Sequence, residues 1–259
     1  MKNQVKNYRV TAWLASPLAG EPPMLDAILG DELACRLGTK NKKKIGRWTP
    51  PSEIEKLPIP LVHTNGIPHC SSPIIPKPAA EWTAHIAKRF DSSRLATLIS
   101  EENRKSVLTT SGPYKSRFQS VRVRLIDRVA WFLRGDKEQV NKLLKSIHAV
   151  GAHRGIGYGQ VWEWTFDEME DDYSIFAPYG GKKMLMRMLP AKYAVDGIVG
   201  YKRSYGAFLP PYWHGGNMHD IIVPVGNSSE TPRIEIISDG TMGLSVNYTT
   251  SIGGRRGVR

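Results

Sequence analysis

The chain has 259 residues, a formal net charge of +12 at pH 7 and a sequence pI near 9.7. A basic excess of this size favours a polyanionic partner, nucleic acid first and an anionic membrane surface second. No run of about 18 apolar residues is present, and the first residues lack the apolar region of a signal peptide, so we expect no membrane span and no secretion signal.

The first predicted elements are a strand and a helix. Residues 9–15 alternate weakly between polar and apolar side chains and stop at Ser16-Pro17, which predicts a strand. Residues 24–37 carry apolar side chains at helical spacing and stop at Gly38, which predicts a helix. A basic loop containing Lys42, Lys43 and Lys44 follows, and it is either a solvated charge run or a flexible phosphate contact.

Residues 57–78 are rich in proline and contain the turn pair Asn65-Gly66 between short extended pieces. After them, Trp82, Ile86 and Phe90 follow one another at a spacing of four residues. This spacing predicts a helix with a buried apolar seam.

The clearest strand pattern of the chain lies in residues 120–126, after which the chain reverses near residues 127–128 and returns as residues 129–133. Arg122 and Arg124 alternate there with apolar side chains. A sheet face with two arginines suits an RNA backbone, but the exposed face of any antiparallel sheet also carries polar residues. Just upstream, Lys115 and Arg117 stand beside aromatic residues, a composition that single-strand binding uses.

Residues 136–150 predict a helix with Asp136 as its N-cap, because the apolar positions follow one stripe. The glycine-rich loop 151–159 comes next and precedes a strand that runs to about residue 166. Dinucleotide and P-loop motifs have the opposite order, with the strand before the glycines and the helix after them. The loop is therefore either a tight helix-to-strand turn or a backbone cradle for a phosphate of another kind.

The positive charge gathers upstream of this loop. Residues 103–154 contain twelve Lys or Arg and only three acidic residues, namely Asp127, Asp136 and Glu138. Residues 167–172 are then acidic with no basic residue, which predicts a domain boundary. We expect domains at 1–170 and 171–259, and the second domain should be smaller and rich in strands. The basic tail at residues 253–259 could contact phosphate or be inert.

The histidines and cysteines give no catalytic or metal signature. His63, His69 and Cys70 do not have the spacing of a zinc site and lack a fourth ligand. Cys35 and Cys70 form no disulfide framework, which favours a reducing cytoplasm. We expect no metal, no cofactor and no catalytic residue, although His153 could act as a general base.

Four segments resemble the RAMP superfamily of CRISPR-Cas proteins. They are residues 8–18, 24–37 and 130–136, and the loop with its flanks at residues 153–161. Together with Pro-Pro-Tyr-Trp at residues 210–213, they are similar to the type IV effector subunit that holds the 5′ handle of the guide RNA. Only the loop is specific by itself.

The resemblance implies an α+β fold. It is a ferredoxin-like (RRM-like) domain over residues 1–170, with residues 38–118 inserted as a thumb. It also implies a non-catalytic subunit that binds the crRNA 5′ handle and caps a filament of backbone RAMP subunits. A large subunit and target DNA near the protospacer-adjacent motif (PAM) are further implied partners. The implied RNA contacts are the loop, the strand and the thumb: His153, Arg154, Gly155, Gly157, Tyr158, Gly159, Arg122, Arg124, Lys115, Arg117, Lys42, Lys43 and Lys44.

Two other functions stay open at this point. Some RAMP relatives cut the CRISPR repeat without a metal, so an endoribonuclease is the first alternative. An RRM-like RNA-binding module that works outside CRISPR systems is the second.

Overall fold

The computed structural model describes residues 5–40, 57–89, 91, 115–213, 215–225, 233–236 and 242–245. Within these ranges the protein mixes α and β structure, with many strands and two α-helices, α1 (Leu25–Lys40) and α4 (Lys137–Leu144). The strands, in chain order, are β1 (Val5–Leu14), β2 (Leu18–Ala19), β3 (His63–Thr64), β4 (Ile67–Pro68), β5 (Ala80–Lys88), β6 (Arg117–Leu125), β7 (Arg128–Asp136), β8 (Val161–Met169), β9 (Phe176–Tyr179), β10 (Lys182–Leu185), β11 (Leu189–Pro190), β12 (Ile198–Val199), β13 (Tyr201–Ala207), β14 (Met218–Pro224), β15 (Arg233–Ile236) and β16 (Met242–Ser245).

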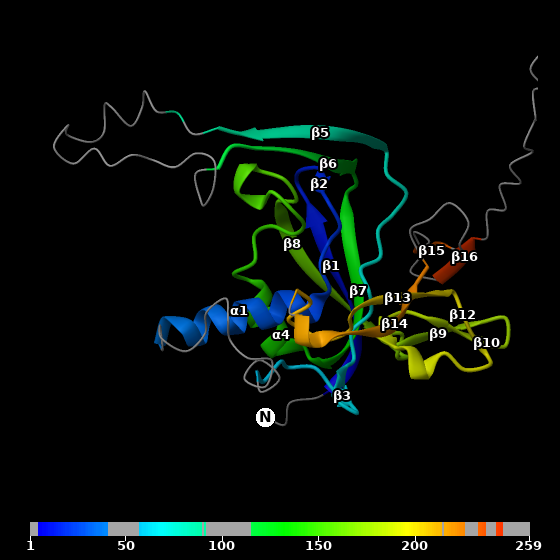
Figure 1. Cartoon of the computed structure of the whole chain (residues 1–259). Helices are drawn as coiled ribbons and strands as arrows, with labels where there is room; N and C mark the ends of the chain where they lie inside the picture. The colour runs from blue at the N-terminus through cyan, green and yellow to red at the C-terminus, as the bar shows by residue number, and fades with distance from the viewer. Residues whose placement is uncertain are drawn as a thin grey trace, which may run out of the picture.

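The centre of the molecule is an antiparallel sheet in the order β7-β1-β8. Alternate side chains of β1, such as Val10 and Ala12, are fully buried on one face, where they join the largest apolar cluster with residues of α1 and α4. Figure 1 shows both helices beside this sheet. The succession of strand, helix, strands, helix and strand is consistent with a ferredoxin-like fold.

The free edge of β7 is covered by residues 57–74, the proline-rich segment. Apart from the short hairpin of β3 and β4, this segment pairs with β7 through isolated bridges at Leu61, Cys70 and Ile74. The bond from the Ser71 amide to the Phe132 carbonyl is 2.8 Å long, and the bond from Ile74 to Ala130 has the same length. Because Pro cannot donate a backbone bond, a proline-rich chain can cover a sheet edge without extending the sheet.

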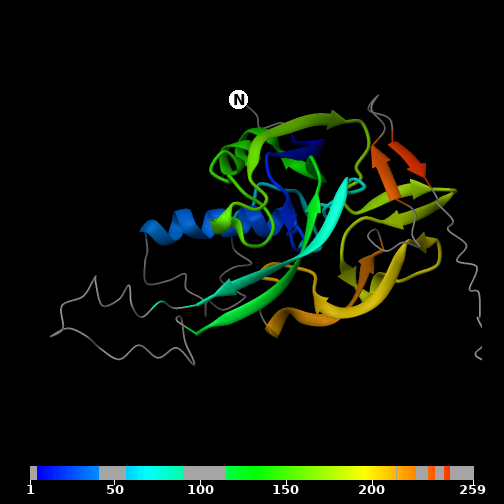
Figure 2. The same cartoon turned by 90° about the horizontal axis from the view of Figure 1, so that it is seen from above.

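Strands β5 and β6 form a long antiparallel ribbon that extends beyond the central sheet (Figures 1 and 2). The helix predicted from Trp82 and Ile86 is therefore wrong, because both residues lie in β5. A period of four residues also fits one face of a strand, whose side chains repeat every two residues. Trp82 is 42% exposed and not part of a buried seam, and Phe90 lies outside the described residues.

The helix predicted over residues 136–150 begins as expected but ends earlier. Asp136 caps α4, and its Oδ1 accepts hydrogen bonds from the amides of Glu138 and Gln139 at 3.0 and 3.1 Å. The helix ends at Leu144 because residues 148–150 turn to pair with the start of β8. The described part of the chain contains no helix that is long and apolar enough to cross a membrane.

Strands β9 to β14 form two small sheets on the far side of β7, as Figure 2 shows from above. They pack against the face of the central sheet that turns away from the helices, where Phe132 of β7 joins a cluster with Met184 and Met186. Arg187 reaches from this part to Asp26 at the start of α1, and both side chains are fully buried. The packing at Phe132 and the ion pair of Arg187 join residues on both sides of the predicted boundary near residue 170. This boundary therefore stays a prediction.

Candidate nucleic-acid interface

The glycine-rich loop is closed at its base by a short antiparallel pairing. The Val150 amide donates to the Gly159 carbonyl at 2.8 Å, and the Val161 amide donates to the His148 carbonyl at 2.8 Å. Residues 151–158 therefore form a compact loop that leaves and re-enters the fold at one place. This place is the end of the central sheet where β1 stops and β8 begins.

Two glycines hold the loop against the connection between β1 and β2. Gly159 has φ +62°, and a Cβ added there would lie 1.9 Å from the Val150 carbonyl oxygen. Gly151 has φ +84°, and its added Cβ would lie 2.6 Å from Leu18. Both positions require glycine for packing and backbone conformation, independently of any ligand.

The middle of the loop has a different character. Arg154 to Ile156 form a single exposed 3-10 turn between two left-handed residues, His153 at φ 55° and Gly157 at φ 97°. An added Cβ at Gly155 or Gly157 meets nothing within 4 Å. This turn is the part of the loop that an incoming strand could approach closely.

The backbone donors of the loop are only partly available for phosphate. The Gly159 amide donates to the Pro17 carbonyl at 2.9 Å, and the Gly157 amide donates to the Arg154 carbonyl at 3.1 Å. These two amides therefore donate within the protein and are not free for an anion, although both glycines are among the implied RNA contacts. The amides of Arg154 and Gly155 stand in the first turn, where no intrahelical acceptor exists.

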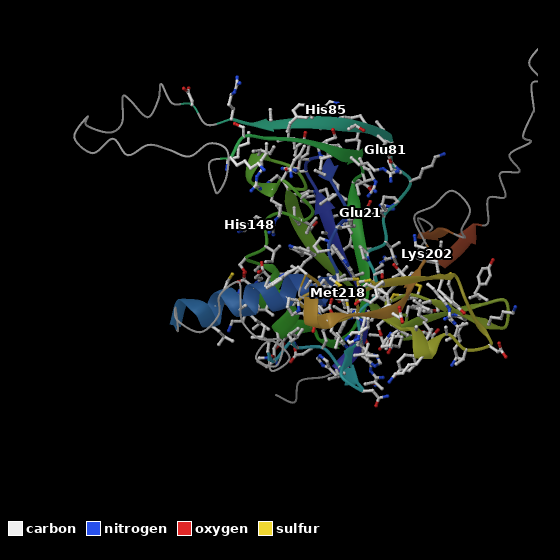
Figure 3. All side chains as sticks on the ribbon, viewed as in Figure 1. Glu21, Glu81, His85, His148, Lys202 and Met218 are labelled. Carbon is white, nitrogen blue, oxygen red and sulfur yellow. The ribbon has the colours of Figure 1, made fainter. Side chains whose placement is uncertain are left out.

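Arg122 and Arg124 of β6 both carry ion pairs, so neither is a freely presented cation. Arg122 binds Glu81 through two hydrogen bonds of 2.6 and 2.8 Å. Arg124 is only 2% exposed, and it binds the carboxylate of Glu21. Figure 3 labels Glu21 and Glu81, the two acidic partners. The hydrogen bond from Arg122 lowers the pKa of Glu81, so both groups stay charged.

The burial of Arg124 changes what can be expected of it. Arg124 Nε also lies 3.7 Å from Glu81 Oε2, so two carboxylates enclose this side chain. Binding a phosphate would require Arg124 to exchange a protein partner for it, and that exchange gains little. Arg124 is better suited to fixing β6 against the turn at Glu21. Arg122 is about half exposed and remains able to present a shared guanidinium at the surface.

The outer end of the ribbon carries further cations. Lys115 and Arg117 are exposed where β6 begins, and Phe118 next to them is 71% exposed and stacks on His85 of β5 with parallel rings. Figure 3 shows His85 well along the ribbon from Glu81. Lys42, Lys43 and Lys44 lie outside the described residues.

Strand β2 brings the loop and the ribbon together. Its Ala19 pairs with Val123 of β6, and the carbonyl of Ala19 accepts the amide of Ala152 at 2.8 Å. The loop therefore lies one strand away from the middle of β6. Ala152 of the loop and Val123 of β6 thus contact the same residue of β2, and Arg122 is the neighbour of Val123 in β6, while Lys115 and Arg117 lie farther out on the ribbon.

The sequence analysis missed a polar cluster at the opposite end of the central sheet. His69 Nδ1 lies 2.9 Å from Asp172 Oδ2, and His69 Nε2 lies 2.8 Å from Thr64 Oγ1. Ser174 Oγ donates to Asp172 Oδ1 at 2.5 Å. Burial opposes ionisation of Asp172, but the hydrogen bonds from His69 and Ser174 outweigh it and lower its pKa to about 2. Because Asp172 follows His69 by 103 residues, no local motif predicts this cluster.

No metal site is apparent in the described ranges, which contain no group of three or more His, Cys, Asp or Glu side chains that could hold an ion. Cys70 is completely buried, and this burial raises the pKa of its thiol to about 12. A buried thiol with so high a pKa is a poor nucleophile.

These features define a basic protein of mixed α and β structure, in which a glycine-rich turn is exposed at one end of a central sheet beside a protruding ribbon. Residues 79–224 match the family model of the CRISPR type IV associated protein Csf3, and the chain belongs to this family. No curated protein matches the chain. Membership makes it a type IV CRISPR-associated subunit, which implies a complex with other Cas subunits. The match contains the ribbon, β7, α4, the loop and β8, and it extends through β14.

Proposed function

We propose that this chain is a non-catalytic crRNA-binding subunit of a type IV CRISPR effector complex. It holds the 5′ handle of the guide with a ferredoxin-like RAMP domain and acts in the cytoplasm. It caps the handle end of a filament of backbone subunits, beside a large subunit and near the PAM of target DNA. Family membership supports the complex, and the geometry below supports the RNA contact.

The observation that carries the proposal is the exposed turn Arg154–Ile156. Arg154 is exposed and forms no ion pair with any residue that the structure describes. Its turn stands on a rigid base fixed by Gly151 and Gly159, so a phosphate bound there meets a preformed site. Guanidinium and phosphate form strong, geometrically specific hydrogen bonds.

The ribbon extends the same surface. Lys115 and Arg117 lie at its outer end with the exposed ring of Phe118. Cations beside an accessible aromatic ring suit a single strand, whose backbone needs charge and whose unpaired bases need stacking partners. In this proposal, the part of the predicted thumb (residues 38–118) that contacts the strand is the ribbon of β5 and β6, since residues 57–74 lie along the edge of β7. Residues 41–56, 90 and 92–114 of the predicted thumb lie outside the described residues.

Co-expression with the other subunits and the guide tests this assignment. The tagged chain should co-purify with crRNA and with the repeated filament subunit, and nuclease protection should map its footprint to the 5′ handle. A footprint within the spacer or at the 3′ end would contradict handle capping. A chain that purifies with cellular RNA but without any Cas subunit would favour the RRM-like alternative.

The second candidate is a metal-independent endoribonuclease, and the His69 cluster is the observation that favours it. An Asp–His pair with a hydroxyl at the other ring nitrogen resembles the arrangement that activates a general base. Incubation of labelled repeat RNA with the protein in EDTA distinguishes the two functions. We expect no discrete product, whereas a product that disappears in His69→Ala would establish the enzyme.

A further inference from the structure

A largely exposed tryptophan lies near the start of β8. Trp162 is 64% exposed, although a Trp side chain is large and gains much from burial. It follows Gly159 by three residues, so their Cα atoms lie within about 11 Å. A single exposed apolar side chain is common on protein surfaces, so the groups around Trp162 decide what its ring can bind.

A second tryptophan supports this ring from β1. The ring centroids of Trp13 and Trp162 are 6.5 Å apart with an interplanar angle of 45°. Trp13 is fixed on its other sides, since its Nε1 donates to Thr165 Oγ1 at 3.1 Å and the guanidinium of Arg128 lies 5.4 Å from its ring centroid. Trp162 therefore packs against a tryptophan whose position is fixed, and the outer face of the Trp162 ring is not covered by the described residues.

A cationic group and a cavity lie beside Trp13. Arg128, which contacts Trp13, also lines a cavity of about 580 Å³ together with Lys77, and this volume is within the range of ligand sites. Pro17 forms part of the same wall, and its carbonyl accepts the amide of Gly159. Asp127 is the acid in this lining, and its Oδ2 accepts a hydrogen bond from Arg128 at 3.1 Å. The cavity is thus lined both by Arg128, which contacts Trp13, and by Pro17, which binds the glycine loop, and its lining has two basic side chains and one acidic one.

We propose that Trp162, supported by Trp13 and Arg128, is a stacking platform for one unpaired nucleobase of the bound strand. The base lies on the exposed ring of Trp162, and the adjoining phosphates pass Lys77 and Arg128 at the cavity. Base stacking on an aromatic ring is tolerant of sequence because every base has a π-face. The inference rests on the proposed RNA binding and adds a contact that reads a base and not only phosphate.

The test compares a labelled ten-residue oligouridine with an abasic ribose-phosphate strand of the same length and charge. Trp162→Ala should weaken binding of the oligouridine about tenfold and binding of the abasic strand less than twofold, because stacking requires a base. Trp162→Phe should restore most of the affinity. Trp213→Ala is the matched control, since Trp213 is similarly exposed at 59% but lies in the C-terminal part.

Arg154→Glu separates this inference from the proposed function, because it should weaken both strands. If Arg154→Glu weakens both but Trp162→Ala weakens neither, the platform is wrong and the loop assignment stands. If Trp162→Ala weakens binding of the oligouridine only, and Arg154→Glu weakens binding of neither strand, the platform stands and the loop assignment fails. An equal loss on both strands in Trp162→Ala would also overturn the platform. Unchanged RNA affinity in Trp162→Ala, together with loss of a co-purifying Cas subunit, would also overturn the platform. That result would make the two rings a contact for another protein.

Discussion

Asp26 and Arg187 form an ion pair with an Nη2–Oδ2 distance of 2.7 Å, although 161 residues separate them and neither side chain is exposed. Arg187 also donates to the carbonyl of Cys70 at 2.8 Å, and Tyr212 donates to the same carboxylate. Four separate segments of the chain thus meet at one guanidinium. The start of α1 and the C-terminal strands are joined here by charge as well as by apolar packing.

Removing one member of this pair should destabilise the protein strongly. Arg187→Met leaves the Asp26 carboxylate buried without its counter-charge, and we expect a loss of about 3–5 kcal/mol in the free energy of unfolding. Urea denaturation measures this change. The double variant Asp26→Leu with Arg187→Met should recover most of the loss, because two apolar side chains leave no buried charge. A double variant as unstable as the single one would contradict the role of the pair.

The Asp172 cluster predicts a loss of stability in acid. The pKa of Asp172 is about 2 in the folded protein and near 3.8 when the carboxyl group is free, so folding is favoured by its ionised form. This contribution is complete above about pH 5 and disappears as the pH falls to about 2. Urea midpoints measured across this range should fall less steeply in Asp172→Asn than in the wild type. Parallel curves for the two proteins would show that the hydrogen bonds to Asp172 do not stabilise the fold.

The glycines of the loop should divide into two groups. Gly159→Ala places a Cβ against the Val150 carbonyl at a positive φ, and we expect a loss of about 2 kcal/mol or more. Gly155→Ala has open space and no positive φ, so it should change stability by less than about 0.5 kcal/mol. Thermal unfolding of the two variants checks the contrast. Equal destabilisation would mean that the middle of the loop is packed and not exposed.

The two cysteines should differ in reactivity. Cys35 is exposed on α1, whereas burial raises the pKa of the Cys70 thiol to about 12. A maleimide should therefore label one thiol in the native protein and two after unfolding, as counted by mass spectrometry. Partial burial, with Asp31 and Glu32 nearby, raises the pKa of Cys35, so its labelling rate should still increase above pH 9. Rapid native labelling of Cys35→Ser would contradict the burial of Cys70.

Local sequence patterns predicted the elements that nearby residues determine. The cap at Asp136, the helix from about residue 24 and the strand around Val123 were confirmed because caps and periodicity depend on adjacent positions. The early end of α4 was not predicted, since it depends on the pairing of residues 148–150 with the start of β8. The helix predicted from the spacing of Trp82 and Ile86 was wrong, because a spacing of four residues fits a strand as well as a helix.

The candidate site was only partly visible in the sequence. The loop and its glycines could be identified, but their division into packed and exposed positions depends on Leu18 and on the carbonyl of Val150. The carboxylates of Glu21 and Glu81 come from segments far from β6, so the pairing of Arg122 and Arg124 was not predictable. The Trp13–Trp162 pair depends on the register of β1 and β8 in the same way.

The central claim is that Arg154 on its exposed turn binds a phosphate of the guide RNA. Filter-binding titrations with 5′ handle RNA over a series of salt concentrations test it most directly. Arg154→Ala should weaken binding about tenfold and reduce the salt slope by about 0.7, and Gly157→Leu should weaken it as well. Arg203→Ala, which removes an exposed cation of β13, is the control and should change neither quantity. Wild-type affinity and salt slope in both loop variants would contradict the account.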